Sequence, residues 1–302
     1  MIQTPNLFVV GAARCGTTSL HRYLAEHPEI FVPERKELSY FGVGDTGEDF
    51  GGPDGALVSG KLPRSLSEYL SYFRGCTDEK IQVDVSPWYL YSSLAAERIR
   101  ESCPKSKIIA ILRNPIDRAY SHYRLMAKLG MEKHERFWDA VAAEQERKTQ
   151  RWTFGWYYSE VGLYGKQLSR YFAHFAPEQI KIIFFEEFIR DTKSVMGDIY
   201  RFLGVREIHP DTYPIYNEAV LPKSRSVKLL LEKGGYLGRL ARPIVRERLR
   251  RRIRAVIEEF NAADKSLDFW ARSRMSMNYK EDKKILESLI GSRILVWPDI
   301  VD

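Results

Sequence analysis

The chain has little cysteine and no long hydrophobic run. Its three cysteines, Cys15, Cys76 and Cys103, form no C-x-x-C pair, and an odd number makes a poor disulfide framework. No stretch of 18 apolar residues is present, so the sequence excludes a membrane-spanning helix. The N-terminus also lacks the basic region of a signal peptide. We therefore expect a cytoplasmic protein.

The sequence also lacks zinc-finger spacings, an aromatic RNA-binding signature, internal repeats and low-complexity segments. Its formal net charge is +7, which suits an anionic ligand. That charge does not by itself imply nucleic acid, and we expect no nucleic-acid partner. The length of 302 residues suits a single α/β domain over residues 1–302, although length alone also permits two domains.

A strand, a small-residue loop and a helix follow one another near the N-terminus. An apolar run at 7–10 leads into Gly11 and Gly16, which have the G-x-x-x-x-G spacing of a phosphate loop. Thr17 stands where an ATP-binding loop carries lysine, and the basic residue is Arg14 instead. We predict a phosphate site that differs from a Mg-triphosphate cradle. The alternative is a tight turn with an exposed arginine.

A second apolar strand, at 107–112, ends in Arg113. Pro115 suits the first turn of a following helix, and Ser121 lies on that helix, eight residues after the arginine. A guanidinium at a strand end and a hydroxyl on the next helix can clamp one more phosphate. The sequence therefore predicts two phosphate sites.

Apolar strands alternate with amphipathic segments along the chain. This alternation predicts an α/β protein with a P-loop-like three-layer fold, in which helices flank a central parallel sheet. The expected strands are residues 7–10, 30–32, 81–85, 107–112 and 180–184. Helices are expected to begin near Thr17, Leu66, Leu94, Ile116, Phe137, Leu163, Thr192, Ser226 and Asp282. The glycine-rich residues 42–63 indicate a long loop.

These motifs resemble those of the sulfotransferase family that uses 3′-phosphoadenosine 5′-phosphosulfate (PAPS). The family's 5′-phosphosulfate loop, roughly P-K-x-G-T-T, is similar to residues 13–18, and its 3′-phosphate motif is similar to residues 113–121. Residues 36–41, Lys-Glu-Leu-Ser-Tyr-Phe, resemble the K-E-P-H-F-F segment of carbohydrate sulfotransferases of the heparan sulfate type. The resemblance implies an enzyme that moves a sulfuryl group from PAPS to a hydroxyl of a carbohydrate, glycolipid or other small metabolite. It also implies release of 3′-phosphoadenosine 5′-phosphate (PAP) and no need for a metal.

The resemblance assigns a role to each motif residue. It makes Glu37 the general base and gives Arg14 and Lys36 the charge that the transferred group and leaving phosphate need. The nucleotide would be held by the two phosphate sites and a late loop, which together comprise Arg14, Cys15, Gly16, Thr17, Thr18, Ser19, Arg113, Ser121, Lys223 and Arg225. Cys15 is expected to fill a tight loop and to have no catalytic role. His122 is the competing base, and Asp84 and Glu34 are lesser candidates.

Two departures from the family pattern are visible. Arg14 occupies the usual position of a lysine, and its forked donors differ in geometry from an ammonium group. In residues 85–89, Val-Ser-Pro-Trp-Tyr, Val85 replaces the lysine of the K-[ST]-P-x-Y segment found in heparan sulfate relatives. This absence weakens the case for a heparan-like acceptor.

Two further segments carry alternative interpretations. The aromatic residues of 151–164 can line an acceptor site or belong to the core. Residues 239–254 carry eight arginines and can lie on an anionic membrane surface or form a solvated face. The competing functions are a P-loop kinase or NTPase and a non-catalytic protein that binds anionic surfaces. The acceptor and the oligomeric state stay open.

Overall fold

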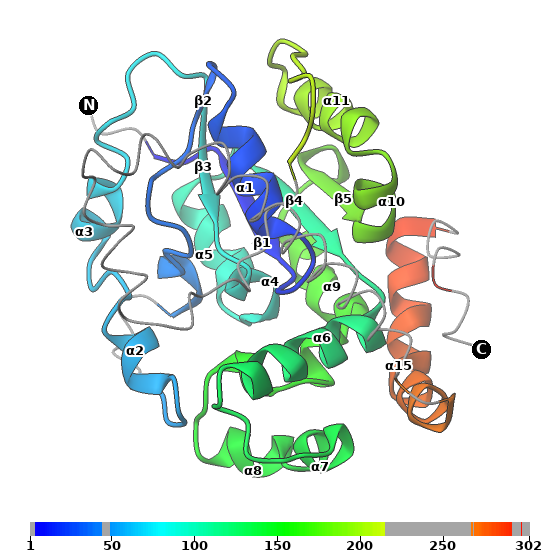
Figure 1. The fold of residues 1–302 in the computed structure, drawn as a ribbon. Helices are drawn as coiled ribbons and strands as arrows, with labels where there is room; N and C mark the ends of the chain where they lie inside the picture. The colour runs from blue at the N-terminus through cyan, green and yellow to red at the C-terminus, as the bar shows by residue number, and fades with distance from the viewer. Residues whose placement is uncertain (1–3, 44–48, 215–266, 268, 292–296, 298–302) are drawn as a thin grey trace, which may run out of the picture. The chain divides into compact units, whose positions relative to one another are not determined.

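The computed structural model describes residues 4–43, 49–214, 267, 269–291 and 297 (Figure 1). Apart from residue 267, they belong to one compact unit, made of Met1–Pro214 and Phe269–Asp302. The expectation of a single domain over residues 1–302 stays a prediction. Ser226, where one helix was expected to begin, lies outside the described residues.

A five-stranded parallel sheet forms the centre, in the order β2-β3-β1-β4-β5. Its strands are β1 (Leu7–Gly11), β2 (Ile30–Phe31), β3 (Ile81–Val85), β4 (Lys107–Leu112) and β5 (Ile180–Phe184). Every residue of β1 and β3 is buried, as expected of parallel strands covered on both faces. The predicted α/β class and parallel sheet are confirmed, with β2 one residue shorter than expected.

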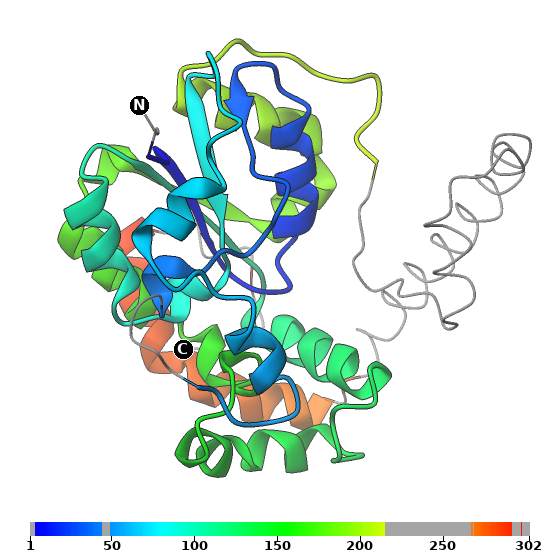
Figure 2. The ribbon, with the colours of Figure 1, turned by 90° about the vertical axis from the view of Figure 1, so that its left-hand side faces the viewer.

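Helices cover both faces of this sheet (Figure 2). Those that pack around the sheet are α1 (Thr17–Ala25), α5 (Ala95–Ser102), α6 (Pro115–Lys128), α9 (Tyr164–His174), α10 (Phe185–Arg190), α11 (Thr192–Leu203) and α15 (Phe269–Ile290). Shorter helices lie in the connections: α2 (Gly55–Ser59), α3 (Leu66–Ser71), α4 (Trp88–Tyr91), α7 (Phe137–Ala142) and α8 (Glu144–Thr149). The single-turn 3₁₀ elements are η1 (Tyr40–Gly42), η3 (Phe154–Trp156), η4 (Glu160–Gly162) and η5 (Pro177–Gln179). Within the expected loop 42–63, the described part contains α2.

The N-termini of α6 and α9 are capped in different ways. Asn114 caps α6, because its Oδ1 accepts hydrogen bonds from Ile116 N at 3.0 Å and Asp117 N at 3.3 Å. Asp282, expected to begin the last helix, instead lies inside α15. Its carboxylate accepts hydrogen bonds from Gly165 N at 2.7 Å and Lys166 N at 2.8 Å, so it caps the neighbouring α9. The expected start at Asp282 is therefore wrong.

Candidate active site

The first phosphate loop lies between β1 and α1. Arg14 has φ 69° and Gly16 has φ 85°, so the chain turns through two left-handed residues before the helix begins. A Cβ on Gly16 would lie 3.1 Å from the Phe185 ring, which leaves little room for another residue. The first N–H groups of a helix have no intrahelical acceptor and point out of its N-terminus. The loop and α1 therefore have the geometry of a phosphate cradle.

The two predicted phosphate sites lie side by side. Strands β1 and β4 are neighbours in the sheet, so the segments that follow them meet at its carboxyl edge. Arg14 Nε donates a hydrogen bond to Ser121 Oγ at 3.3 Å, and Ser121 is fully buried on α6. Arg113 follows β4, with its guanidinium 5.0 Å from the centre of the Phe185 ring. Two guanidinium groups and one helix N-terminus therefore border the same edge.

Cys15 is a buried thiol beneath this edge. Burial raises its pKa to about 11, although the charges of Arg118 and Arg113 act in the opposite direction. Its Sγ lies 3.6 Å from Ala13 O and 4.0 Å from Tyr164 OH. A neutral, enclosed thiol is a poor nucleophile, which agrees with the expected space-filling role.

Arg118 is a residue whose importance the sequence reasoning missed. Its side chain is fully buried and donates to Tyr158 O, while its Nε and Nη1 have no hydrogen-bond partner among the described residues. Its charge acts on the pKa values of both Cys15 and His122, so it lies beneath the phosphate loop. One pattern in the sequence could have pointed to Arg118: it lies three residues before Ser121, so both lie on one face of α6.

Lys36 contacts both Thr18, at the end of the phosphate loop, and its neighbour Glu37. Lys36 Nζ donates to Thr18 Oγ1 at 2.7 Å and lies 3.4 Å from Glu37 Oε1. The Lys36 side chain is 13% exposed and that of Glu37 is 51% exposed, so the carboxylate is open to an incoming acceptor. The sequence placed Thr18 in one motif and Lys36 with Glu37 in another, and the fold brings the two motifs together.

The lesser base candidates have different surroundings. Asp84 is buried and accepts hydrogen bonds from Ser86, Tyr69 and Tyr89 hydroxyls, and burial raises the pKa of its carboxyl. His122 is buried beside Tyr158, where burial and nearby arginines hold its pKa well below the usual range. Glu34 is exposed at the protein surface.

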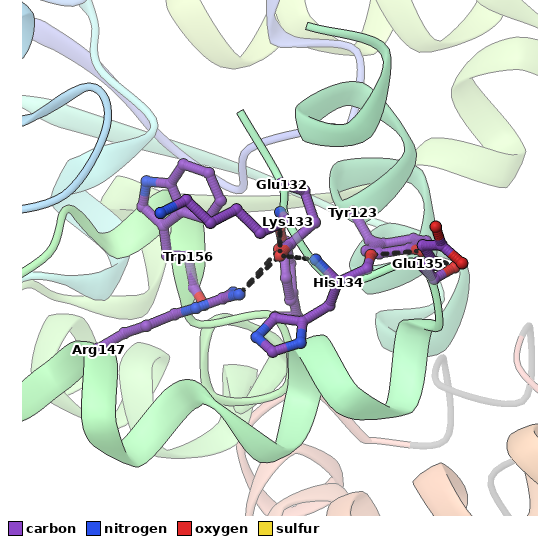
Figure 3. A network of polar contacts seen from close by, with 8 residues as sticks. Tyr123, Glu132, Lys133, His134, Glu135, Arg147 and Trp156 are labelled. Carbon is purple, nitrogen blue, oxygen red and sulfur yellow. Dashed lines mark hydrogen bonds and ion pairs between the residues drawn. The ribbon is translucent and has the colours of Figure 1, made fainter. Parts of the chain in front are cut away.

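The aromatic segment 151–164 belongs mostly to the core. Trp156, Tyr158 and Tyr164 are buried, whereas Trp152 and Phe154 are half-buried and line a cavity of about 520 Å³. A buried ion pair supports the segment: Arg147 Nη2 lies 2.8 Å from Glu132 Oε1 (Figure 3). The Arg147 guanidinium also lies 5.3 Å from the Trp152 ring and 5.2 Å from the Trp156 ring.

Three predicted features lie outside the described residues: Lys223, Arg225 and the basic segment 239–254. Their roles stay predictions. In the part of the chain that the structure describes, no helix combines the length and apolar character needed to cross a membrane.

Comparison with known proteins gives one consistent family. The sulfotransferase domain model matches residues 4–213. Human bifunctional heparan sulfate N-deacetylase/N-sulfotransferase 3 is 26% identical over 217 residues, which cover 67% of this chain and 22% of that protein. Human heparan sulfate glucosamine 3-O-sulfotransferase 3B1 is 23% identical over 216 residues, which cover 72% of this chain and 50% of that protein.

The chain thus spans half or less of the length of these two curated relatives. A crystal structure of a sulfotransferase from Alicyclobacillus acidocaldarius is 31% identical, with a TM-score of 0.76, and the match covers 98% of this chain and 99% of that one. The domain match, this shared fold and the phosphate-loop geometry agree with the resemblance read from the motifs. The chain belongs to the sulfotransferase family, and the predicted enzyme class is confirmed with it.

Proposed function

We propose that the protein transfers a sulfuryl group from PAPS to a hydroxyl of a carbohydrate or related small acceptor, with Glu37 as the general base. The observation that carries this proposal is the position of Lys36, which contacts Thr18 at 2.7 Å and Glu37 at 3.4 Å. One ammonium group thereby joins the phosphate loop to an exposed carboxylate. Sulfuryl transfer needs this pairing of a proton acceptor with a cationic phosphate site.

The residues at this edge fit a nucleotide with two phosphate groups. Arg14 and the N-terminus of α1 would hold the 5′ end, and Arg113 with Ser121 would hold the 3′-phosphate. When bound, PAPS supplies an activated sulfuryl group attached through its bridging oxygen. The described edge carries two arginines and one lysine, so the negative charge of such a ligand would be offset.

The chemistry of the chain's own residues follows from these positions. Glu37 accepts the proton of the acceptor hydroxyl as the new oxygen–sulfur bond forms. Arg14 and the α1 N–H groups stabilise the charge that develops on the leaving phosphate oxygen as its bond to sulfur breaks. Lys36 contacts both the phosphate loop and Glu37, so it would interact with the sulfuryl group in transit.

The acceptor is proposed to be a carbohydrate because both curated relatives carry heparan sulfate sulfotransferase names. Val85 replaces a lysine of that subgroup's pattern, so the acceptor panel should include neutral sugars and glycolipids beside acidic glycans.

The test has a binding arm and a turnover arm. Calorimetric titration should give micromolar affinity for PAP and much weaker affinity for ATP with Mg²⁺, and Arg113→Ala should weaken PAP binding strongly. Glu37→Gln should abolish transfer from labelled PAPS while leaving PAP affinity intact. Glu34→Gln, an exposed carboxylate in the same segment, is the matched control and should retain turnover. Tight ATP binding without preference for PAP would instead favour the kinase, and unchanged turnover in Glu37→Gln would remove Glu37 as the base.

A further inference from the structure

Residues 37–43, the segment that carries Glu37, donate backbone N–H hydrogen bonds to the end of β3 and to residues that follow it. Glu37 N donates to Val85 O at 3.1 Å. Two residues later, Ser39 N donates to the hydroxyl of Ser86 at 2.9 Å. Phe41 N lies 3.4 Å from the hydroxyl of Tyr89 and donates to it. Two of these three attachments therefore end on side-chain hydroxyls and not on the backbone.

Both hydroxyls are in turn fixed by Asp84. Ser86 Oγ donates to Asp84 Oδ1 at 2.6 Å, and Tyr89 OH donates to Asp84 Oδ2 at 2.7 Å. Asp84 is 1% exposed, and a buried carboxylate is costly unless it receives hydrogen bonds. Each hydroxyl has one hydrogen, and it donates that hydrogen to the carboxylate. The hydroxyl oxygen is then oriented to accept a hydrogen bond from a backbone N–H of residues 37–43.

The backbone of this segment needs such support. Glu37 has φ 63° and Ser39 has φ 54°, so both lie in the left-handed region that non-glycine residues rarely adopt. Conformations of this kind persist where the surrounding structure holds them. On the basis of the proposed function, we propose that Asp84 is a positioning residue, which fixes the Glu37 backbone through the hydroxyls of Ser86 and Tyr89.

The network contains its own matched control. Tyr69 also donates to Asp84 Oδ2, at 2.9 Å, and is as fully buried as Tyr89. No described backbone N–H of residues 37–43 donates to Tyr69. Tyr69→Phe and Tyr89→Phe therefore remove the same kind of bond to Asp84, but only the second also removes an acceptor for the Glu37 segment.

The experiment measures turnover, PAP affinity and thermal stability for Ser86→Ala, Tyr89→Phe and Tyr69→Phe, with Glu37→Gln beside them. Ser86→Ala and Tyr89→Phe should lower kcat by about 10- to 100-fold, the cost of small displacements of a catalytic group, with PAP affinity unchanged. Tyr69→Phe should lose comparable thermal stability but keep kcat within about threefold of the parent protein.

Equal kcat in Tyr69→Phe, Tyr89→Phe and Ser86→Ala, with Glu37→Gln inactive, would overturn the positioning role and leave the proposed base intact. Full activity in Glu37→Gln would overturn the proposed base itself. If Tyr89→Phe fails to fold, Ser86→Ala decides the question, because it removes the shorter of the two hydroxyl-mediated attachments.

A second inference rests on the cavity of about 520 Å³ beside α4. No residue named above for the nucleotide or for catalysis lines it. Trp88, Tyr91, Trp152 and Phe154 supply aromatic walls, and its volume is within the range of small-molecule sites. The cavity is therefore a second candidate binding site.

The lining of this cavity carries excess positive charge. Its basic residues are Lys148, Arg151, Lys166 and Arg170. Glu160 is the one acidic residue among the described lining residues, and Lys148 Nζ already contacts it at 2.6 Å. Arg170 Nη2 donates hydrogen bonds to Leu90 O at 3.0 Å and Tyr91 O at 2.9 Å, whereas its buried Nε has no hydrogen-bond partner among the described residues. Among the described lining residues, one carboxylate thus faces four basic side chains, and Asp282, outside the lining, also interacts electrostatically with Lys166.

We infer that the cavity binds a small organic anion that carries a ring, such as a sugar acid or an aryl sulfonate. Aromatic walls suit the ring face, and the basic residues suit the anionic group. Titrations with glucuronate and benzenesulfonate show whether the cavity prefers a sugar acid or an aryl sulfonate. Glucose tests the need for charge, and inorganic sulfate tests the need for the ring.

The double variant Arg151→Glu/Lys166→Glu should weaken binding of the preferred anion at least tenfold, whereas Lys105→Glu, an exposed charge reversal elsewhere, should not. Saturating PAP should leave this binding unchanged. Equal binding by the double variant, or equal affinity for glucose or sulfate, would overturn the inference.

Discussion

Arg14 donates a hydrogen bond from Nε to Ser121 Oγ at 3.3 Å, although the two residues are 107 positions apart. Arg14 belongs to the loop after β1, and Ser121 to the helix that follows β4. Because β1 and β4 pair directly, the loops at their carboxyl ends meet. The residues predicted for two different phosphates of one nucleotide thus form a continuous polar edge.

Arg14→Ala should weaken PAP binding by about 10- to 100-fold, because hydrogen bonds to charged groups contribute about 1.5–3 kcal/mol. Calorimetric titration with PAP measures the change. Arg22→Ala is the control, since Arg22 lies exposed on α1, the helix that follows the loop, and this variant should bind PAP normally. An unchanged affinity in Arg14→Ala would contradict the proposed role of the loop arginine.

The contact between Lys36 and Thr18 should be visible as energetic coupling. Lys36→Met and Thr18→Val each remove one partner of the 2.7 Å hydrogen bond. We expect each single variant to lower kcat/KM, and the double variant to lose less than the product of the two effects. A double-mutant cycle should give a coupling energy of about 0.5–3 kcal/mol. Strict additivity would show that the contact does not contribute to turnover.

The strands and the phosphate loop could be predicted because their signals are local. Apolar runs mark β1 and β4, and glycine spacing with a following amphipathic helix marks the loop. Asp282 shows the limit of such signals. An acidic residue near a helical pattern is read as a helix start, whereas here it caps α9 from inside another helix. A cap supplied from 116 residues away leaves no local pattern.

The hydrogen bonds that hold the backbone around Glu37 could not be predicted, for a similar reason. Ser86 and Tyr89 were recognised as motif residues, but their use as acceptors for the 37–43 segment depends on how that segment lies against β3. This arrangement depends on β2 pairing with β3. The buried charge of Arg118 also became interpretable only when the fold placed it beneath the phosphate loop.

The buried pair of Arg147 and Glu132 should contribute strongly to folding. Their side chains are 4% and 1% exposed, and Tyr158 OH donates to Glu132 Oε2 at 2.7 Å. Removing one partner of a buried pair leaves an uncompensated charge, so Glu132→Gln should lower the free energy of unfolding by about 3–5 kcal/mol. Urea denaturation measures this. Glu135→Gln, an exposed neighbour, should change it by less than about 0.5 kcal/mol, and equal effects would refute the importance of the pair.

His122 should make the protein less stable as the pH falls below neutrality. Burial, and then the charges of Arg118 and Arg14, hold its pKa in the folded protein well below 6.5. The unfolded chain binds a proton at this imidazole below about pH 6.5, whereas the folded protein does not, so acid favours unfolding. This contribution is fully present above that pH and decreases as the pH falls toward the folded pKa. The protein should therefore have a lower free energy of unfolding at pH 5.5 than at pH 7.

Denaturation curves at both pH values for the parent protein, His122→Asn and His134→Asn test this expectation. His122→Asn should flatten the dependence of unfolding free energy on pH, because asparagine has no proton to gain in the unfolded state. His134 has an exposed side chain, so His134→Asn should keep the slope of the parent protein. A slope that is the same in all three proteins would show that another group is responsible for the acid sensitivity.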